Sequence, residues 1–186
     1  PGSTEYGYGT AATRRGDGLS GWASENLHQT VARTDLAASL DELTAVCPNL
    51  ERVALVVAWF GDDLRLDHCR VAPRVEDTGK AVELPWSVAG LERDAAEPVS
   101  ADDGAPNYGG SPADATVLQA IAAIKARGLK VVLYPFVMMD IPVGNGLADP
   151  YGGAEQAAHP WRGRITCHPA PGRPGSPDRT PAVATP

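Results

Sequence analysis

Aspartates stand directly after the two longest apolar runs of the chain. Residues 53–60 lead, through one glycine, into Asp62 and Asp63, and residues 131–139 lead into Asp140. Glycoside hydrolysis uses two carboxyl groups, about 5–5.5 Å apart for retention or about 6.5–9.5 Å apart for inversion. Asp62, Asp63 and Asp140 are therefore candidate acid–base residues. The alternative is that these aspartates only cap backbone amides in turns.

Aromatic residues lie in or beside the loops that are expected on the same face as the aspartates. Flat rings can stack on the apolar faces of sugars, although buried aromatic residues more often belong to a core. Trp59, inside the first apolar run, is assigned to the core. The candidate substrate-binding residues are Trp161, Tyr108, Tyr151 and Trp86.

The two apolar runs also predict the elements that position these residues. Residues 53–60 and 131–139 carry apolar side chains without alternation. Such runs are typical of strands in parallel sheets, which are buried on both faces. In a β/α barrel the loops after the strands build the active-site face. The pattern therefore predicts an α/β fold with the aspartates at the ends of two parallel strands.

Two helices accompany the strands. Thr34 is the predicted N-cap of the first helix, which ends near Cys47 because Pro48 follows. Ser111 is the predicted N-cap of the second helix, and Gly128 supplies a left-handed residue after its last turn. The second helix lies between the two strands, so these elements predict a right-handed βαβ unit.

The connection between the first strand and the second helix is an insertion of about fifty residues, longer than usual for a βα connection. Residues 64–68 and 81–84 alternate and flank a turn at 77–80, which predicts a surface hairpin. Three other segments are expected to be short or irregular: a helical turn within 22–31, a polar loop at 102–110 and a long loop at 141–161.

Composition excludes several classes of function. The net charge of -7 with scattered basic residues disfavours a nucleic-acid partner. No apolar run approaches the ~20 residues of a membrane span. The four histidines share no metal-ligand spacing, and no phosphate-binding glycine loop follows a strand, so neither a metal nor another cofactor is predicted. Three cysteines form no CxxC pair; they are either three thiols or one disulfide with a spare thiol: Cys47, Cys69 and Cys167.

Five phrases of the sequence carry a family resemblance. They are residues 57–65, 126–131, 134–142, 149–153 and 160–167, and the matched region runs from about residue 20 to residue 177. Together they resemble the TIM-barrel-like domain of the large tail-tip protein of gene transfer agents, the phage-like particles of alphaproteobacteria. That domain is also labelled glycoside-hydrolase-like, and its parent protein is a tail hub or host-specificity component.

The resemblance implies that the chain is the N-terminal βαβ portion of a (β/α) TIM-barrel-like domain with a hairpin insertion. Residues 1–20 are then a lead-in, 21–166 belong to the barrel domain, and 167–186 are a proline-rich linker or loop. A complete barrel needs about 200–250 residues or more, and two strands are clear in this chain. The first residues include no initiator methionine and the last twenty are rich in proline, so both ends are expected to be those of a cut piece or a processed product.

The function implied by the resemblance is structural: a component of the tail tip or baseplate hub whose barrel contacts the recipient cell envelope. The expected partners are other tail and baseplate proteins, the rest of the same polypeptide and an envelope polysaccharide. The expected location is the tail tip of a particle that assembles in the bacterial cytoplasm and is released. An active glycosidase for peptidoglycan or capsule is one alternative, and a carbohydrate-binding module without turnover is another.

The enzyme alternative lacks one part in this sequence. Barrel glycosidases of this kind place a glutamate acid at the end of a later strand. The glutamates considered for this role precede a strand or lie in the insertion and loops, so none takes it over: Glu51, Glu76, Glu83, Glu92, Glu97 and Glu155.

Overall fold

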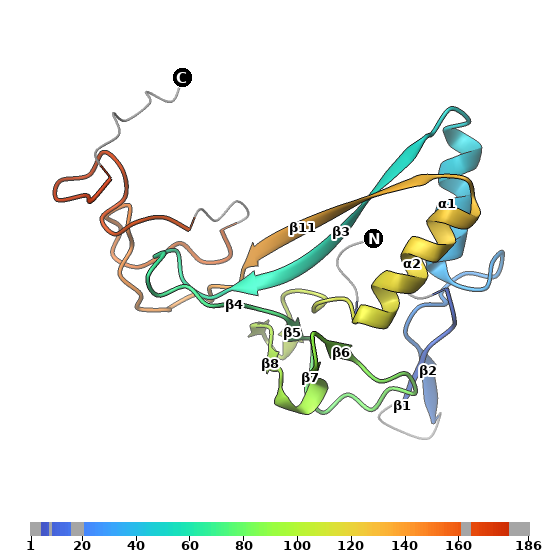
Figure 1. The fold of residues 1–186 in the computed structure, drawn as a ribbon. Coiled ribbons are helices and arrows are strands. Elements are labelled where there is room, and N and C mark those ends of the chain that lie inside the picture. Colours follow the sequence, from blue (N-terminus) through green and yellow to red (C-terminus); the bar gives the residue numbers. More distant parts are fainter. Residues whose placement is uncertain (1–4, 8, 16–20, 161–164, 179–186) are drawn as a thin grey trace. The chain divides into compact units, whose positions relative to one another are not determined.

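The computed structural model describes residues 5–7, 9–15, 21–160 and 165–178. Within these ranges the chain forms two α-helices and several small sheets, which is a mixed α/β architecture without a closed barrel (Figure 1). The chain folds as two compact units. The first comprises Pro1–Ala58 and Pro73–Phe136, and the second comprises Trp59–Ala72 and Val137–Pro186.

The two predicted strands are confirmed, each slightly longer than expected. β3 spans Arg52–Gly61 and β11 spans Lys130–Met139, and they are neighbours in a sheet of order β11-β3-β4. Their arrows run in the same direction in Figure 1, as the prediction of parallel strands requires. β4, Val71–Ala72, pairs antiparallel with the last two residues of β3. Both long strands contribute residues to both units.

The register between β3 and β11 is the same at both ends of the pair. The amide of Lys130 donates to the carbonyl of Glu51 at 2.9 Å, and the amide of Asp140 donates to the carbonyl of Gly61 at 2.9 Å. In a regular parallel ladder, successive residues of a strand direct their backbone N–H and C=O groups alternately toward the neighbouring strand on one side and on the other. The even-numbered residues of β11 therefore turn their backbone groups toward β3, and the odd-numbered residues, Pro135 among them, turn theirs toward the outer edge.

The first helix agrees with the sequence prediction. α1 spans Asp35–Val46, and the Thr34 side chain accepts a hydrogen bond from the amide of Ala37 at 3.2 Å. Cys47 is the C-terminal cap, as the following proline requires.

The second helix begins later than predicted. α2 spans Asp114–Ala126 with Ala113 as N-cap, so the prediction of Ser111 in that role is wrong. Ser111 is fully buried, and its hydroxyl accepts a hydrogen bond from the amide of Arg74 at 3.2 Å. The side chain that was expected to cap the helix instead satisfies a backbone group of the insertion.

The end of α2 is the Schellman motif that the sequence predicts. Gly128 has φ +75° and donates to the carbonyl of Lys125 at 2.9 Å. Leu129 then donates to the carbonyl of Ile124 at 3.4 Å. Both leucine and isoleucine side chains belong to one buried cluster, which supplies the apolar contact that accompanies this motif.

The main core of the first unit lies between the two helices and one face of the long strands. Its buried residues are Leu40, Ile124 and Leu129. Partly buried residues from both helices and both strands pack around them: Leu36, Leu50, Val53, Leu55, Ala123 and Val131. The helices therefore cover the first part of one face of the β3–β11 pair (Figure 1), and Leu133, farther along the same face, is 55% exposed.

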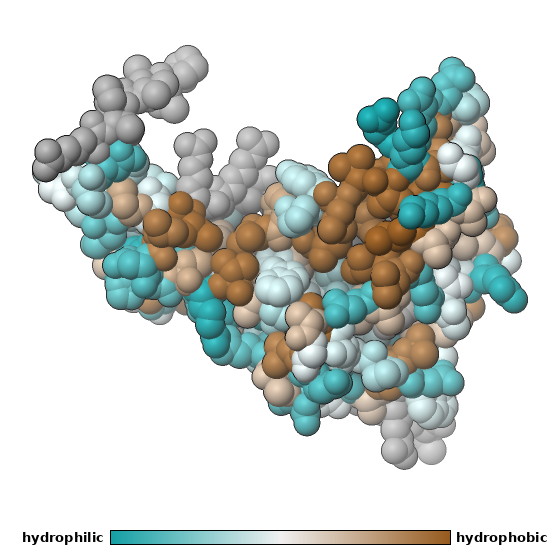
Figure 2. All heavy atoms as spheres, viewed as in Figure 1, coloured by the Kyte–Doolittle hydropathy of each residue, from teal (hydrophilic) through white to brown (hydrophobic). Residues whose placement is uncertain are grey.

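The opposite face of these strands is open, so the prediction that both faces are buried is wrong for this chain. Val56, Val132 and Tyr134, which share that face, are 52%, 47% and 51% exposed. Figure 2 shows hydrophobic side chains at the surface in the region of the long strands. The apolar character of the strands matches a sheet with a second covering layer, which the described residues do not provide.

The predicted hairpin in the insertion does not form. Residues 64–68 belong to the second unit, and residues 81–84 belong to the first. The insertion instead folds into two-residue strands in three pairs. They are β5 (Arg74–Val75) with β8 (Glu97–Pro98), β6 (Ser87–Val88) with β7 (Leu91–Glu92), and β9 (Ala101–Asp102) with β10 (Ala105–Pro106).

The two tight hairpins of the insertion follow one rule. Ala89 and Gly90 join β6 to β7, and Asp103 and Gly104 join β9 to β10; all four residues have positive φ. Two successive left-handed residues make the type I′ turn, whose twist matches that of paired strands. A short 3-10 helix, η1 at Arg93–Ala95, follows β7.

The N-terminal region differs from its prediction as well. β1, Thr13–Arg15, pairs antiparallel with β2, Trp22–Ser24, so the predicted helical turn within 22–31 is wrong. Residues 141–160 form no helix or strand, as expected for the long loop. No helix in the described ranges has both the length and the apolar character needed to cross a membrane.

Candidate functional site

The three aspartates at the strand ends all belong to the second unit. Asp62 has a structural task there. Its Oδ1 accepts a hydrogen bond from the amide of Arg70 at 2.8 Å, and its Oδ2 lies 3.8 Å from the Arg70 Nε. Asp62 therefore closes the turn that leads from β3 toward β4.

Asp63 is a buried anion with four donors around it. Arg65 contacts it through Nε at 2.9 Å and Nη2 at 2.6 Å, and also donates its own amide at 2.8 Å. The Gln156 Nε2 donates to it at 2.7 Å. Burial alone raises the pKa of Asp63, but the hydrogen bonds from Arg65 and Gln156 outweigh it and hold the pKa well below its usual range. Asp63 thus stays ionised and is unsuited to act as a general acid.

Gln156 holds the long loop against the end of β3. It is 1% exposed. Its Oε1 accepts from the amide of Leu64 at 2.8 Å, and its Nε2 donates to Asp63 and to the carbonyl of Ala148 at 3.0 Å. Sequence reasoning missed both Gln156 and Arg65. The sequence pattern assigns Arg65 to the predicted hairpin, and nothing in the sequence around Gln156 indicates a partner more than ninety residues away.

Asp140 has a different environment. It is 2% exposed and stands between Met139 and Ile141, which are buried together with Leu64 in the core of the second unit. A carboxyl group that is enclosed at a strand end is the arrangement used for acid–base residues in barrel enzymes. Of the three aspartates, Asp140 therefore remains the candidate for such a role.

The predicted sugar-binding aromatics are divided between the units. Tyr151 belongs to the unit of the aspartates and is 38% exposed. Trp86 and the half-buried Tyr108 belong to the first unit. Trp86 is 2% exposed, and its Nε1 donates to the carbonyl of Ser111 at 2.8 Å, so its ring offers little area to a sugar. Trp161 lies outside the described residues.

The first unit contains a buried charge cluster that the sequence did not reveal. The Arg93 Nη2 donates to Glu5 Oε2 at 2.6 Å and to the Tyr6 hydroxyl, and Nη1 donates to the carbonyl of Asp77 at 2.9 Å. The guanidinium lies 5.8 Å from the ring of Tyr6 and 5.9 Å from that of Trp86. Burial and the charge of Glu5 raise the pKa of Tyr6 far above its usual range, so its hydroxyl stays protonated.

A lysine completes this cluster. The Lys80 Nζ contacts Glu25 at 2.8 Å and Glu76 at 2.6 Å, and it lies 5.2 Å from the centre of the Tyr6 ring. Burial by itself lowers the pKa of Lys80, but the hydrogen bonds with Glu25 and Glu76 raise it above its ordinary value. Lys80 therefore carries its charge at every physiological pH.

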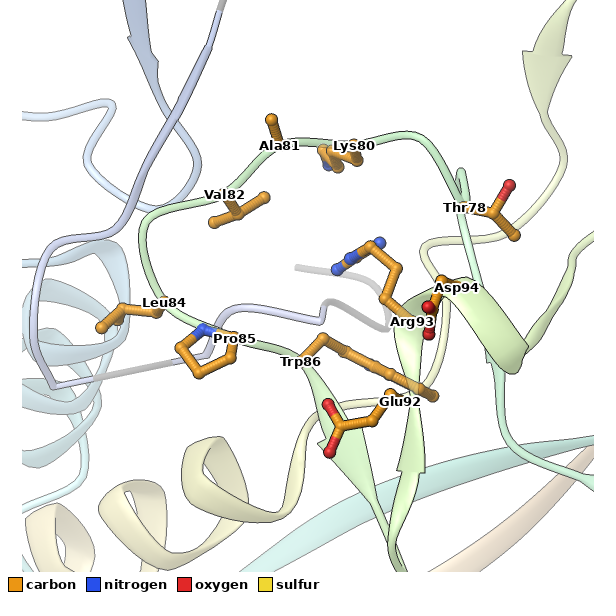
Figure 3. A pocket seen from close by; sticks show the side chains of 10 residues that line it. All are labelled: Thr78, Lys80, Ala81, Val82, Leu84, Pro85, Trp86, Glu92, Arg93 and Asp94. Carbon is orange, nitrogen blue, oxygen red and sulfur yellow. The ribbon is translucent and has the colours of Figure 1, made fainter.

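A cavity of about 290 Å³ borders this cluster (Figure 3). It is lined by the arch of residues 78–86 and by Glu92, Arg93 and Asp94, and the side chain of Arg93 reaches into the space that the arch encloses. Because Glu5, Glu25 and Glu76 already neutralise Arg93 and Lys80, the cavity offers no unbalanced cation to an anionic ligand.

The described part of the chain offers few side chains for metal binding or disulfide formation. No group of three or more metal-ligating side chains is gathered there. Cys47, Cys69 and Cys167 form no disulfide, which favours the prediction of three thiols.

No family model matches the chain, and no curated protein matches its sequence.

Proposed function

We propose that the chain is a structural component of the tail tip or baseplate hub of a gene transfer agent or related phage-like particle. The five phrases that resemble the tail-tip domain support this proposal. The observation that carries it is the environment of Asp63, whose carboxylate oxygens already accept hydrogen bonds from Arg65 and Gln156. In the proposed barrel, this carboxylate at a strand end holds loops together instead of carrying out acid–base chemistry.

The open face of the long strands supports the proposed partners. Val56, Val132 and Tyr134 leave about half of their surface exposed on one face of a parallel pair. Apolar exposure of this kind marks a surface that another layer covers. The rest of the same polypeptide supplies that layer in the proposed barrel, and other tail or baseplate proteins contact the completed domain.

Two observations keep the alternatives testable. The enclosed carboxyl group of Asp140 favours the glycosidase, and the exposed ring of Tyr151 in the same unit favours a carbohydrate-binding role. A glycosidase needs a second carboxyl group within about 10 Å of the first, and the saturated Asp63 cannot donate a proton. Asp140 would then work with a residue from another part of the full-length protein.

The test compares particles and purified full-length protein that carry three changes: deletion of this region, Asp140→Asn and Tyr151→Ala. The structural proposal expects that the deletion stops tail-tip assembly, while Asp140→Asn particles assemble and deliver DNA normally. Release of sugar ends from peptidoglycan or capsule, lost in Asp140→Asn, would establish the glycosidase instead. Retention on the glycan without release, lost in Tyr151→Ala, would establish the binding module. Normal assembly after the deletion would overturn the structural role.

A further inference from the structure

The N-terminal segment at residues 5–7 and 9–12 is held by groups that lie far from it in the sequence. Glu5 is fully buried. Its carboxylate accepts from Arg93 at 2.6 Å and from the amide of Glu76 at 2.7 Å, and its carbonyl accepts from the Thr116 hydroxyl at 3.0 Å. A Cβ placed on Gly110 would come within 2.6 Å of the Glu5 carboxylate, so the surrounding chain fits closely around this side chain.

The next residue of the segment is recognised by its ring and its backbone. Tyr6 is 1% exposed, and its ring faces the charged ends of Lys80 and Arg93 at 5.2 and 5.8 Å. The Asn26 Nδ2 donates to the carbonyl of Tyr6 at 3.1 Å. The glutamate is therefore recognised by its charge, and the tyrosine that follows it is recognised by its ring and by its backbone carbonyl.

Asn26 fixes the path of the segment beyond the tyrosine. Its Nδ2 also donates to the carbonyl of Thr10 at 3.0 Å, and its Oδ1 accepts from the amide of Ala12 at 2.8 Å. One side chain thus satisfies three backbone groups of the segment. When a protein binds a peptide, main-chain hydrogen bonds of this kind give affinity and side-chain contacts give specificity.

We infer that residues 5–7 and 9–12 behave as a peptide ligand of a site in the rest of the chain, which we call the seat and define by its binding residues: Asn26, Glu76, Lys80, Arg93 and Thr116. All contacts between segment and seat are non-covalent, and every seat residue lies C-terminal to the β1–β2 connection at residues 16–21. The seat can therefore bind the same segment from a second copy of the chain, with the same contacts.

Charge complementarity decides what the seat accepts. With the segment removed, the buried guanidinium of Arg93 would lose its carboxylate partner, and an uncompensated buried charge is strongly unfavourable. The seat therefore favours an occupant that offers a glutamate beside an aromatic ring. The segment of a neighbouring copy meets this condition, and exchanging identical elements is an inexpensive route to a dimer.

The experiment uses the 186-residue chain with a protease recognition sequence inserted between β1 and β2. Intact protein, refolded at high concentration from a mixture of two fluorescently labelled populations, is expected to give dimers that carry both labels. Cleavage at the inserted sequence should convert these dimers into species of monomer size, because the cut linker is what covalently joins each segment to the other subunit of a swapped pair. Dimers that persist after cleavage, or the absence of mixed dimers, would overturn the inference.

A second measurement tests the recognition chemistry on the cleaved monomer. A labelled peptide of residues 1–15 is expected to exchange into the seat, whereas the Glu5→Gln peptide should compete about tenfold or more weakly because it loses a charge-assisted hydrogen bond. The Ala11→Ser peptide, changed at an exposed position, serves as the matched control and should compete like the natural one. Equal competition by the Glu5→Gln peptide would refute the proposed role of Glu5, and circular dichroism of the cleaved protein verifies that the seat is folded.

Discussion

Removing the charge of Arg93 should destabilise the first unit more than any surface change of the same kind. Arg93→Met keeps an apolar stem of similar length but removes the guanidinium, which donates to Glu5, Tyr6 and the carbonyl of Asp77. The carboxylate of Glu5, fully buried, then keeps the amide of Glu76 as a donor and loses its cation.

The expected cost follows from this geometry. Breaking a buried ion pair by removing one partner costs about 3–5 kcal/mol, since the remaining charge is left uncompensated. Arg52→Met is the matched control, because Arg52 pairs with Glu51 at 3.5 Å on the surface, where both side chains are more than half exposed. Such exposed pairs contribute about 0–1 kcal/mol.

Urea unfolding, followed by circular dichroism, gives the free energy of unfolding for each variant. The double variant Glu5→Gln/Arg93→Met should lose less stability than the sum of its two single variants, by about 1–3 kcal/mol, because neutral glutamine tolerates the loss of the cation. The reasoning would be refuted if Arg93→Met cost no more than Arg52→Met, or if the two changes were additive.

Three further changes have defined outcomes. Asp63→Asn should lower the free energy of unfolding at pH 7 by about 1.5–3 kcal/mol. The pKa of Asp63 is lower in the folded than in the unfolded protein, so its contribution to the free energy of unfolding is present above the unfolded pKa of about 3.9 and is lost as the pH falls below that value. The urea curves of the two proteins should therefore converge in acid, and a constant gap between them would contradict this. Gly110→Ala should cost clearly more than Gly104→Ala in thermal melts, since both glycines have positive φ but only the first meets another side chain within 3 Å; equal costs would refute the close fit. Tyr134→Pro should destabilise the chain by about 1–3 kcal/mol more than Leu133→Pro, because it removes an amide that faces β3 instead of one that faces the outer edge; the reverse order would disprove the register.

The sequence predicted the parts of the fold that depend on local rules. Thr34 caps its helix and Gly128 ends the other because these residue types satisfy the terminal backbone groups within a few positions. The two long strands were equally clear, since short apolar runs that are rich in β-branched and aromatic residues are typical of buried strands. Ser111 was misread because a competing backbone partner, the amide of Arg74, lies far away in the sequence.

The insertion was predicted poorly because its strands are too short to show alternation. The signal that was available is the Asp103-Gly104 pair, which is typical of a type I′ turn and does join two strands. For the candidate site, the positions of the aspartates after the strands were predicted correctly. Their different environments were not, since these depend on Arg65 and Gln156, whose contacts with Asp63 follow from the path of the loops.

Pro135 limits the pairing of further strands along the outer edge of β11. It is one of the residues of β11 whose backbone groups face the outer edge, and it has no amide hydrogen there. The row of donors along that edge is therefore divided into two short stretches on either side of position 135. Fibrils of stacked identical strands need an unbroken ladder, and a single missing donor in the middle interrupts it. One proline ring thus lowers the tendency of this strand edge to stack into fibrils.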